Sequence, residues 1–155
     1  MSDSIAQHAA PEEKLEKIFF YLPTDDDGYP PYSYESLWAE KIRDDTYRIE
    51  NIPFFVRELC VDDIVAVSDE DGSLYFQEVL EYSRHNTVRV VVIEEERTTH
   101  LISGFRKLGL AFEGLDNYLF AIDIDDPEKM AQLANFLADG EEKGWWEYEE
   151  SALRL

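Results

Sequence analysis

The second half of the chain alternates strand-like and helix-like hydrophobic periodicity, and the order of these segments limits the possible folds. Residues 87–93 have the β-branched composition of a strand, and residues 98–108 repeat apolar side chains at helical spacing. Residues 111–124 predict two strands around a short turn, and residues 126–140 predict a second helix. Residues 146–150 alternate as a strand does, with a helix as the alternative. The order strand, helix, strand, strand, helix, strand is that of a ferredoxin-like βαββαβ unit.

The ends of the two expected helices carry residues that favour them. Thr98 or Thr99 can cap the first helix, and Gly109 can end it. Asp126 is a suitable N-cap for the second helix, whose apolar stripe stops shortly before Gly140. We therefore expect Gly140 to terminate the second helix.

The first half of the chain predicts β-structure. Residues 17–22 have the composition of a strand. Asp44-Asp45 and Asp71-Gly72 each lie between two β-rich arms, which is the pattern of a β-hairpin. These segments predict an antiparallel β meander or a small barrel.

Together these patterns indicate the α+β class, in which the N-terminal antiparallel β meander or small barrel packs with the C-terminal ferredoxin-like unit. We expect residues 1–14 to be a flexible N-terminus and residues 15–155 to form one domain. Within that domain, residues 15–86 are the β-rich subdomain and residues 87–155 are the ferredoxin-like one. The hydrophobic fraction of 45% and the aromatic fraction of 14% are ample for a packed core.

A short apolar segment interrupts the β-rich half. Phe54, Phe55 and Val56 follow Pro53 directly. Phe55 and Leu59 recur at near-helical spacing, so we expect one helical turn that plugs the end of the meander. The alternative is that these side chains form a contact face for a partner.

The charge of the chain restricts its partners. Asp and Glu number 35 against 14 Lys and Arg, so the formal net charge is -21. Such a surface repels the phosphates of nucleic acids and the headgroups of anionic membranes, whereas it attracts a basic protein. The alternative is that the acidity only keeps the protein soluble.

Acidic residues are concentrated in runs, at least three of which lie at expected turns or element ends. Acid clusters interleaved with aromatic residues suit a partner rich in Lys and Arg, although each run can also be a solvated rim. The four runs are Asp25–Asp27, Asp69–Asp71, Glu94–Glu96 and Glu147–Glu150. The candidate partner-binding residues are Asp69, Glu70, Asp71, Glu94, Glu95, Glu96, Trp145, Glu147, Glu149 and Glu150.

No side-chain pattern points to a metal site. An EF-hand register around Gly72 places Val67 at the first ligand position, so a β-turn is the better interpretation. The run Asp123–Asp126 is acidic enough for Mg²⁺, but its last residue is already explained as a helix cap. The only cysteine, Cys60, excludes an internal disulfide and a Cys-based zinc site.

Catalytic signatures are equally weak. A dyad of Cys60 with His85 or His100 is chemically reasonable, yet no spacing selects it, and a buried cysteine is usually a small hydrophobe. His8 falls in the expected flexible terminus, and the chain contains no glycine-rich phosphate loop. We therefore expect a protein that is not an enzyme and uses neither a metal nor a cofactor.

The N-terminal sequence lacks the basic region and the apolar run of a signal peptide, and no stretch is long and apolar enough to span a bilayer. We expect a cytoplasmic protein.

Several motifs in the central segment resemble one family. Trp38-Ala39-Glu40 leads to Asn51–Phe55, and an Asp63-Ile64-Val65 strand entry follows. His85 then lies in a turn before a valine-rich strand, and Trp146–Glu150 resembles the family's ending. In these motifs the chain resembles the bacterial domain-of-unknown-function family numbered 4265.

The resemblance covers roughly residues 36–150 and implies a small bacterial cytosolic protein, but it supplies neither an activity nor catalytic residues. By analogy, small acidic domains of this type occur as immunity proteins beside secreted toxins. We therefore expect an immunity- or antitoxin-like protein that occludes the basic active-site cleft of a toxin or effector. The alternatives are a regulatory small-ligand-binding domain, and a hydrolase that uses carboxylates or Cys60.

Overall fold

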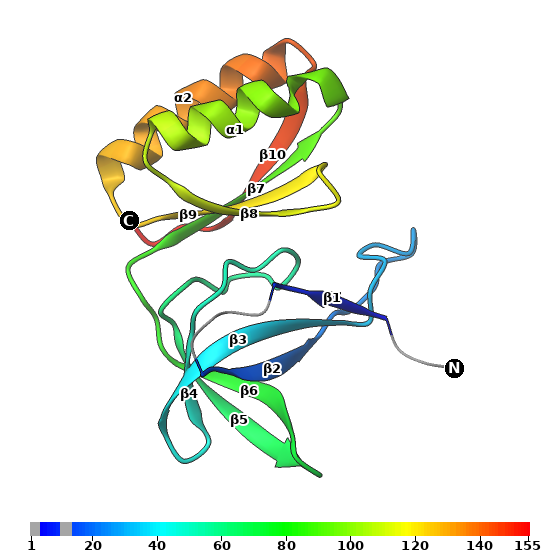
Figure 1. Cartoon of the computed structure of the whole chain (residues 1–155), viewed down its shortest axis with the longest axis vertical. Helices are drawn as coiled ribbons and strands as arrows, with labels where there is room; N and C mark the ends of the chain where they lie inside the picture. Colours follow the sequence, from blue (N-terminus) through cyan, green and yellow to red (C-terminus); the bar gives the residue numbers. More distant parts are fainter. Residues whose placement is uncertain (1–3, 10–13) are drawn as a thin grey trace. The chain divides into compact units, whose positions relative to one another are not determined.

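The computed structural model describes residues 4–9 and 14–155, and the fold is of the α+β class, with ten strands and two α-helices in this part of the chain (Figure 1). The chain forms two compact units, of which the first runs to Ser83 and the second runs from Arg84 to Leu155. The strands of the first unit are β1 (Ile5–Gln7), β2 (Glu16–Tyr21), β3 (Tyr34–Arg43), β4 (Thr46–Ile49), β5 (Ile64–Glu70) and β6 (Ser73–Glu81).

The strands of the first unit form a sheet in the order β1-β3-β2-β6-β5-β4, and an additional pairing joins β3 to β4. Strands β2 to β6 therefore pair in a closed ring. The β1–β3 and β2–β6 pairings are parallel, so the sheet is not antiparallel throughout, as the meander form of the expected meander or small barrel would be. Alternate side chains of these strands, such as Ile18, Leu37 and Val65, fill the interior of the ring.

The two expected hairpins are present, and each turn has the left-handed backbone that its residues tolerate. Asp45, between β3 and β4, has φ 57°, and Asp71 and Gly72, between β5 and β6, have φ 55° and 90°. Positive φ at both central residues, as at Asp71 and Gly72, is typical of the type I′ hairpin turn, which matches the twist of the two strands.

The N-terminal segment departs from the expected flexible terminus wherever the structure describes it. Ile5–Gln7 pairs in parallel with β3, and Ala6 and His8 are buried. The ring of His8 stacks on that of Phe54, with centroids 4.3 Å apart. The remaining residues of that expectation, 1–3 and 10–13, lie outside the described residues.

A buried carboxylate organises the apolar segment that follows β4. Glu35, on β3, is fully buried, and its side chain accepts hydrogen bonds from the backbone N–H groups of Phe54, Phe55 and Val56 at 2.7, 2.9 and 3.0 Å. The Nε2 atom of His8 lies 2.8 Å from the same carboxylate. Consecutive N–H groups converging on one carboxylate form a nest, which compensates a buried negative charge.

The expected helical turn in this segment is absent, since no residue between Glu50 and Asp63 is helical. The N–H groups of Phe54 to Val56 bond to Glu35 rather than to preceding carbonyls, which explains why no helix forms. Phe54 and Phe55 are nevertheless buried, and Leu59 belongs to the core of the ring.

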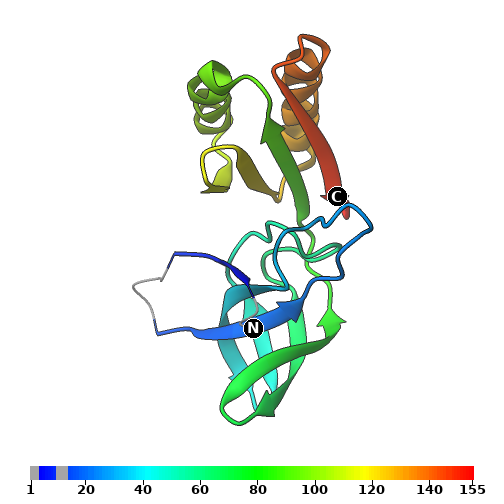
Figure 2. The ribbon, with the colours of Figure 1, turned by 90° about the vertical axis from the view of Figure 1, so that its right-hand side faces the viewer.

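The second unit places two helices against one face of a four-stranded sheet (Figures 1 and 2). The strand order is β10-β7-β9-β8, and all three pairings are antiparallel. Val90, Phe120 and Ile122 of the sheet pack with Leu101 and Leu137 of the helices. The elements are β7 (Asn86–Val92), a 3₁₀ turn (Glu95–Arg97), α1 (Thr98–Lys107), β8 (Ala111–Leu115), β9 (Leu119–Ile124), α2 (Pro127–Glu142) and β10 (Trp146–Ala152).

The helix caps agree with the sequence in part. The Asp126 side chain accepts a hydrogen bond from the N–H of Glu128, and the left-handed Gly109 follows α1, as expected. The threonine cap of α1 is wrong. Its N-cap is Arg97, which makes no side-chain cap, because the preceding 3₁₀ turn already supplies carbonyls in helical register.

Gly140 does not end α2, which continues to Glu142. A Cβ atom at Gly140 would overlap the indole of Trp146, whose Nε1–H donates to the carbonyl of Leu137 at 2.9 Å. Gly140 is therefore required for the close packing of the Trp146 side chain on α2. A different glycine, the left-handed Gly144 (φ 77°), follows the end of α2.

None of the helices in the described part of the chain is long and apolar enough to cross a membrane.

We predict that Glu35→Gln lowers the free energy of unfolding by about 3 kcal/mol, because the amide cannot accept all the buried N–H groups that the carboxylate accepts. Urea denaturation measures the change. Glu40→Gln, on the exposed part of the same strand, should change stability by less than about 1 kcal/mol. Equal losses in the two variants would contradict the organising role of Glu35.

We predict that Phe55→Ala destabilises the protein by about 3 kcal/mol, because the ring is buried beside Tyr29 and Tyr32. The midpoint of urea unfolding reports this loss. Unchanged stability together with lost partner binding would instead identify the segment as a contact face.

Candidate functional site

Three side chains form one row across neighbouring strands of the first unit. Arg48 on β4 is the register partner of Ile64 on β5, and Ile64 is in turn the partner of Glu81 on β6. Register partners present their side chains on the same face of a sheet. Strand pairing thus brings together an arginine and a glutamate that lie 33 positions apart in the sequence.

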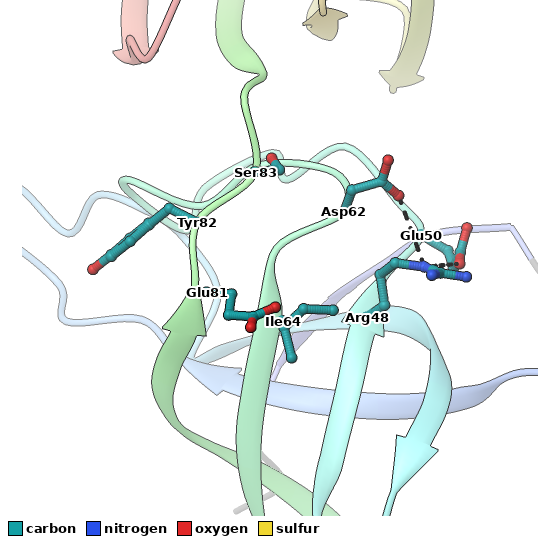
Figure 3. A pocket seen from close by; sticks show the side chains of 7 residues that line it. All are labelled: Arg48, Glu50, Asp62, Ile64, Glu81, Tyr82 and Ser83. Carbon is teal, nitrogen blue, oxygen red and sulfur yellow. Dashed lines mark hydrogen bonds and ion pairs between the residues drawn. The ribbon is translucent and has the colours of Figure 1, made fainter.

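This row forms the floor of a pocket of about 570 Å³ at one end of the ring (Figure 3). Figure 3 shows Glu50 and Asp62 beside the guanidinium of Arg48, whereas Tyr82 lies on the opposite side of the pocket. The ring of Tyr82 is 67% exposed. The pocket is lined by Arg48, Glu50, Asp62, Ile64, Glu81, Tyr82 and Ser83.

Arg48 is the cation of this pocket, and several carboxylates surround it. Its guanidinium forms an ion pair with Glu40, and its Nε lies 3.4 Å from Glu50 and 3.9 Å from Asp62. Burial lowers the pKa of Arg48, but the neighbouring carboxylates outweigh burial and raise its pKa overall. The positive charge of Arg48 is therefore fully compensated within the protein.

Two carboxylates of the pocket, those of Glu50 and Glu81, are less well compensated than the arginine. Burial raises the pKa of Glu50, the charges of Asp62 and Glu40 raise it further, and Arg48 offsets only part of this rise. Glu81 is exposed and forms no ion pair within the described residues. The pocket lining therefore holds two carboxylates, Glu50 and Glu81, whose negative charge is only partly offset within the described residues.

The acidic run Asp69–Asp71, the first that supplies candidate partner-binding residues, lies at the turn between β5 and β6. All three side chains are exposed, and Oδ1 of Asp69 accepts a hydrogen bond from the N–H of Gly72 at 2.9 Å. Part of this acidity therefore stabilises the turn itself.

Another acidic run lies in the second unit, together with the candidate residue Trp145. This run is Glu94–Glu96. The N–H of Glu94 donates to the carbonyl of Trp145 at 3.0 Å. The ring of Trp145 already contacts two cations of the same unit, with Arg97 at 4.0 Å and Lys143 at 4.7 Å from its centroid. Trp145 therefore already makes the cation–π contacts that a basic partner would offer.

The run Glu147–Glu150 lies within β10. Glu147, Glu149 and Glu150 are exposed, the preceding Trp146 is buried, and Tyr148 is half-buried, in agreement with the expected alternation of Trp146 and Tyr148 against Glu147 and Glu149. Glu149 lies 3.6 Å from the guanidinium of Arg89 on the neighbouring strand β7. Only part of this run is therefore uncompensated.

Cys60 and the two histidines considered with it have separate surroundings. Cys60 is buried in the first unit, where its N–H donates to the Asp63 carboxylate at 2.9 Å. In the second unit, His85 lies 2.8 Å from the Asp123 carboxylate, and His100 contacts the rings of three aromatic residues. These contacts give no support to a Cys60–histidine dyad.

Across the residues that the structure describes, no group of three or more His, Cys, Asp or Glu side chains is arranged to hold a metal ion.

A comparison with known families decides the relationship of the chain. The family described as "Domain of unknown function (DUF4265)" matches residues 35–148. The chain belongs to the DUF4265 family. The matched range begins at Glu35 and includes every residue of the Arg48 pocket. The family membership expected from the Asn51–Phe55 segment and its neighbours is thus confirmed.

Solved structures place the fold of this DUF4265 chain in a wider context. It is similar to a hypothetical protein from Neisseria gonorrhoeae whose crystal structure is known, with a TM-score of 0.77 and 21% sequence identity. The similarity covers 94% of this chain and 99% of that one. At this identity the likeness shows the fold alone. No curated protein matches the chain.

Sequence reasoning missed the pocket of the DUF4265 chain, because its residues come from separate strands with no shared motif. The one signal that could have revealed the pocket is the register of the strands. Once β4, β5 and β6 are paired in this register, Arg48 and Glu81 lie in one row with Ile64. That register contains two irregularities between β5 and β6, which sequence periodicity does not reveal.

We predict that Glu50→Gln changes how stability depends on pH. The folded-state pKa of Glu50 is raised, so its contribution to stability is greatest below its unfolded-state pKa and is lost as pH rises through the folded value. Relative to the wild type, Glu50→Gln should therefore gain stability between about pH 4 and about pH 7. Urea unfolding at both pH values measures this, with the exposed Glu142→Gln as the control. A relative loss over the same interval would contradict the raised pKa.

Proposed function

We propose that this DUF4265 chain is a protein-binding module that accepts a Lys or Arg side chain of a basic partner in the Arg48 pocket. The observation that carries the proposal is the excess negative charge of Glu50 and Glu81 in that pocket, because Arg48 offsets only part of the rise in the pKa of Glu50 and Glu81 forms no ion pair within the described residues. A second cation entering the pocket would neutralise this excess.

The partly buried carboxylate of Glu50 favours the binding of a partner's cation in the pocket. Glu50 is partly desolvated, and its raised pKa means that the ionised form is disfavoured by its surroundings. A cation bound beside it would stabilise the ionised form, and so would be held more strongly than by an exposed carboxylate. Arg48 fixes the positions of Glu50 and Asp62 before the partner arrives, which reduces the entropy cost of binding.

The exposed ring of Tyr82 supports a protein partner. Tyr and Arg are enriched among the residues that dominate binding energy at interfaces, whereas isolated rim charges contribute little. A pocket that combines Tyr82 with the paired Arg48 and the apolar Ile64 offers both apolar contact and charge.

The other acidic residues suit a steering role. Asp69–Asp71 and the exposed glutamates of β10 lie outside the pocket, and the net charge is -21. A strong field of one sign accelerates encounter with an oppositely charged protein without itself fixing the register of the complex.

We propose that the partner is a toxin or effector with a basic active-site cleft, so that the protein acts as a cytoplasmic immunity or antitoxin-like inhibitor rather than as an enzyme. Occlusion of such a cleft needs a complementary acidic surface and no catalytic residues of its own. The acidic pocket is consistent with this role.

A second candidate is a regulatory domain that binds a small cationic ligand. The pocket volume of about 570 Å³ is within the range of small-molecule sites. The order β10-β7-β9-β8, with a helix after β7 and another after β9, supports a ferredoxin-like second unit, a plan common in sensors. A thermal-shift screen against amines, amino acids and nucleotides distinguishes the candidates, because only the second requires a shift of several degrees.

We predict that Glu81→Lys weakens the complex with the basic partner at least about tenfold, because it places a cation where the partner's cation would enter. Co-expression with the product of the neighbouring gene, followed by co-purification and titration, measures the affinity. Glu142→Lys, which makes the same charge change on α2, should have a much smaller effect. Separate purification of the two wild-type proteins at low salt would refute that pairing, and equal losses in both variants would exclude the pocket.

A further inference from the structure

Helix α1 is an exception to the acidity of the chain. Its ten residues, Thr98–Lys107, include no carboxylate, although Asp and Glu outnumber Lys and Arg by 35 to 14 overall. Two hollows lie along its exposed side, and Ser103 and Lys107 line both of them. The other lining residues of the two hollows also include no carboxylate.

The smaller hollow is apolar and lies between the two helices of the second unit. Its volume is about 250 Å³, and Gly104 and Leu108 of α1 and Phe136 of α2 contribute to its lining. A Cβ atom at Gly104 would overlap the ring of Phe136, so the absence of a side chain there allows the ring to lie directly on α1. Gly104 and Phe136 together therefore form a flat apolar floor.

The larger hollow, of about 510 Å³, is bordered by two adjacent cations. Arg106 and Lys107 are exposed, and neither forms an ion pair with any residue in the described ranges. By contrast, Arg48, Arg97 and Lys143 each lie within 4 Å of a carboxylate. The partial negative charge at the C-terminus of a helix is only about half an elementary charge, so it does not neutralise two full cations.

We propose that the exposed side of α1 binds a short acidic segment of a partner protein, one that carries a large apolar side chain among its carboxylates. The apolar side chain enters the hollow over Phe136, and the flanking carboxylates pair with Arg106 and Lys107. This surface is separate from the Arg48 pocket and takes a ligand of the opposite charge.

The size of the apolar hollow favours a peptide side chain over a free small molecule. Pockets for drug-sized ligands occupy about 300–1,000 Å³, whereas this one holds about 250 Å³. A single aromatic or branched aliphatic side chain in such a hollow is the usual anchor of a protein contact. A nucleic acid has the required negative charge, but the net charge of -21 repels a long phosphate backbone.

The test uses the full chain and a fluorescein-labelled peptide with the sequence EDLFED. Fluorescence anisotropy should show saturable binding, which a peptide with lysines in place of the acids and a peptide with serines in place of LF should both lack. Lys107→Glu and Gln132→Glu should each weaken binding about tenfold, because each places a carboxylate in the apolar hollow's lining.

Two matched variants control for the added charge. Asn135→Glu adds the same charge to an exposed position of α2 outside the hollow, and Arg43→Glu reverses an exposed cation of the first unit. Both should leave the affinity unchanged. Absence of binding by the wild type up to about 1 mM peptide, tighter binding of the lysine peptide, or equal losses in Gln132→Glu and Asn135→Glu would each overturn the proposal.

Discussion

The first unit depends on one buried carboxylate. Glu35 joins three separate parts of the chain, because it lies on β3, accepts the N–H groups of Phe54 to Val56, and meets His8 beyond β1. A buried ion of this kind costs several kcal/mol in desolvation unless it is surrounded by donors, and here four donor groups surround it. Removing any of the three parts would leave the carboxylate or its donors unsatisfied, so the parts must form together.

The same device is repeated nearby with other side chains. The Asp63 carboxylate accepts the N–H of Cys60 at 2.9 Å and the N–H of Ser83 at 2.8 Å, and the Asn51 side chain accepts the N–H of Trp38 at 2.7 Å. These contacts fix the irregular segment between β4 and β5 without secondary structure of its own. That segment carries Glu50 and Asp62, which line the Arg48 pocket. The geometry of the pocket therefore depends on buried carboxylates, those of Glu35 and Asp63, that accept hydrogen bonds from backbone N–H groups of the segment.

Features encoded by neighbouring residues could be predicted from the sequence, whereas features that depend on distant partners could not. The turns at Asp45 and Gly72 and the cap at Asp126 require only local backbone chemistry. Gly140 has the sequence pattern of a helix end, but its role comes from Trp146, which packs on it from a strand. His8 has the local sequence of a flexible terminus, whereas its partner Glu35 lies 27 positions away. The Arg48 pocket needed the register of three strands, and the periodicity of each strand alone does not specify it.

The two surfaces proposed here should respond differently to salt, because the net charge acts on them with opposite signs. For a basic partner, the overall field and the Arg48 pocket both attract, so added salt weakens both contributions. For an acidic peptide, the overall field repels while Arg106 and Lys107 attract at short range. Screening beyond about 8 Å at physiological ionic strength removes the long-range repulsion before it removes contacts between adjacent charges. Binding at α1 should therefore tolerate moderate salt that already weakens binding at the acidic pocket, which makes ionic strength a means of separating the two interactions in one protein.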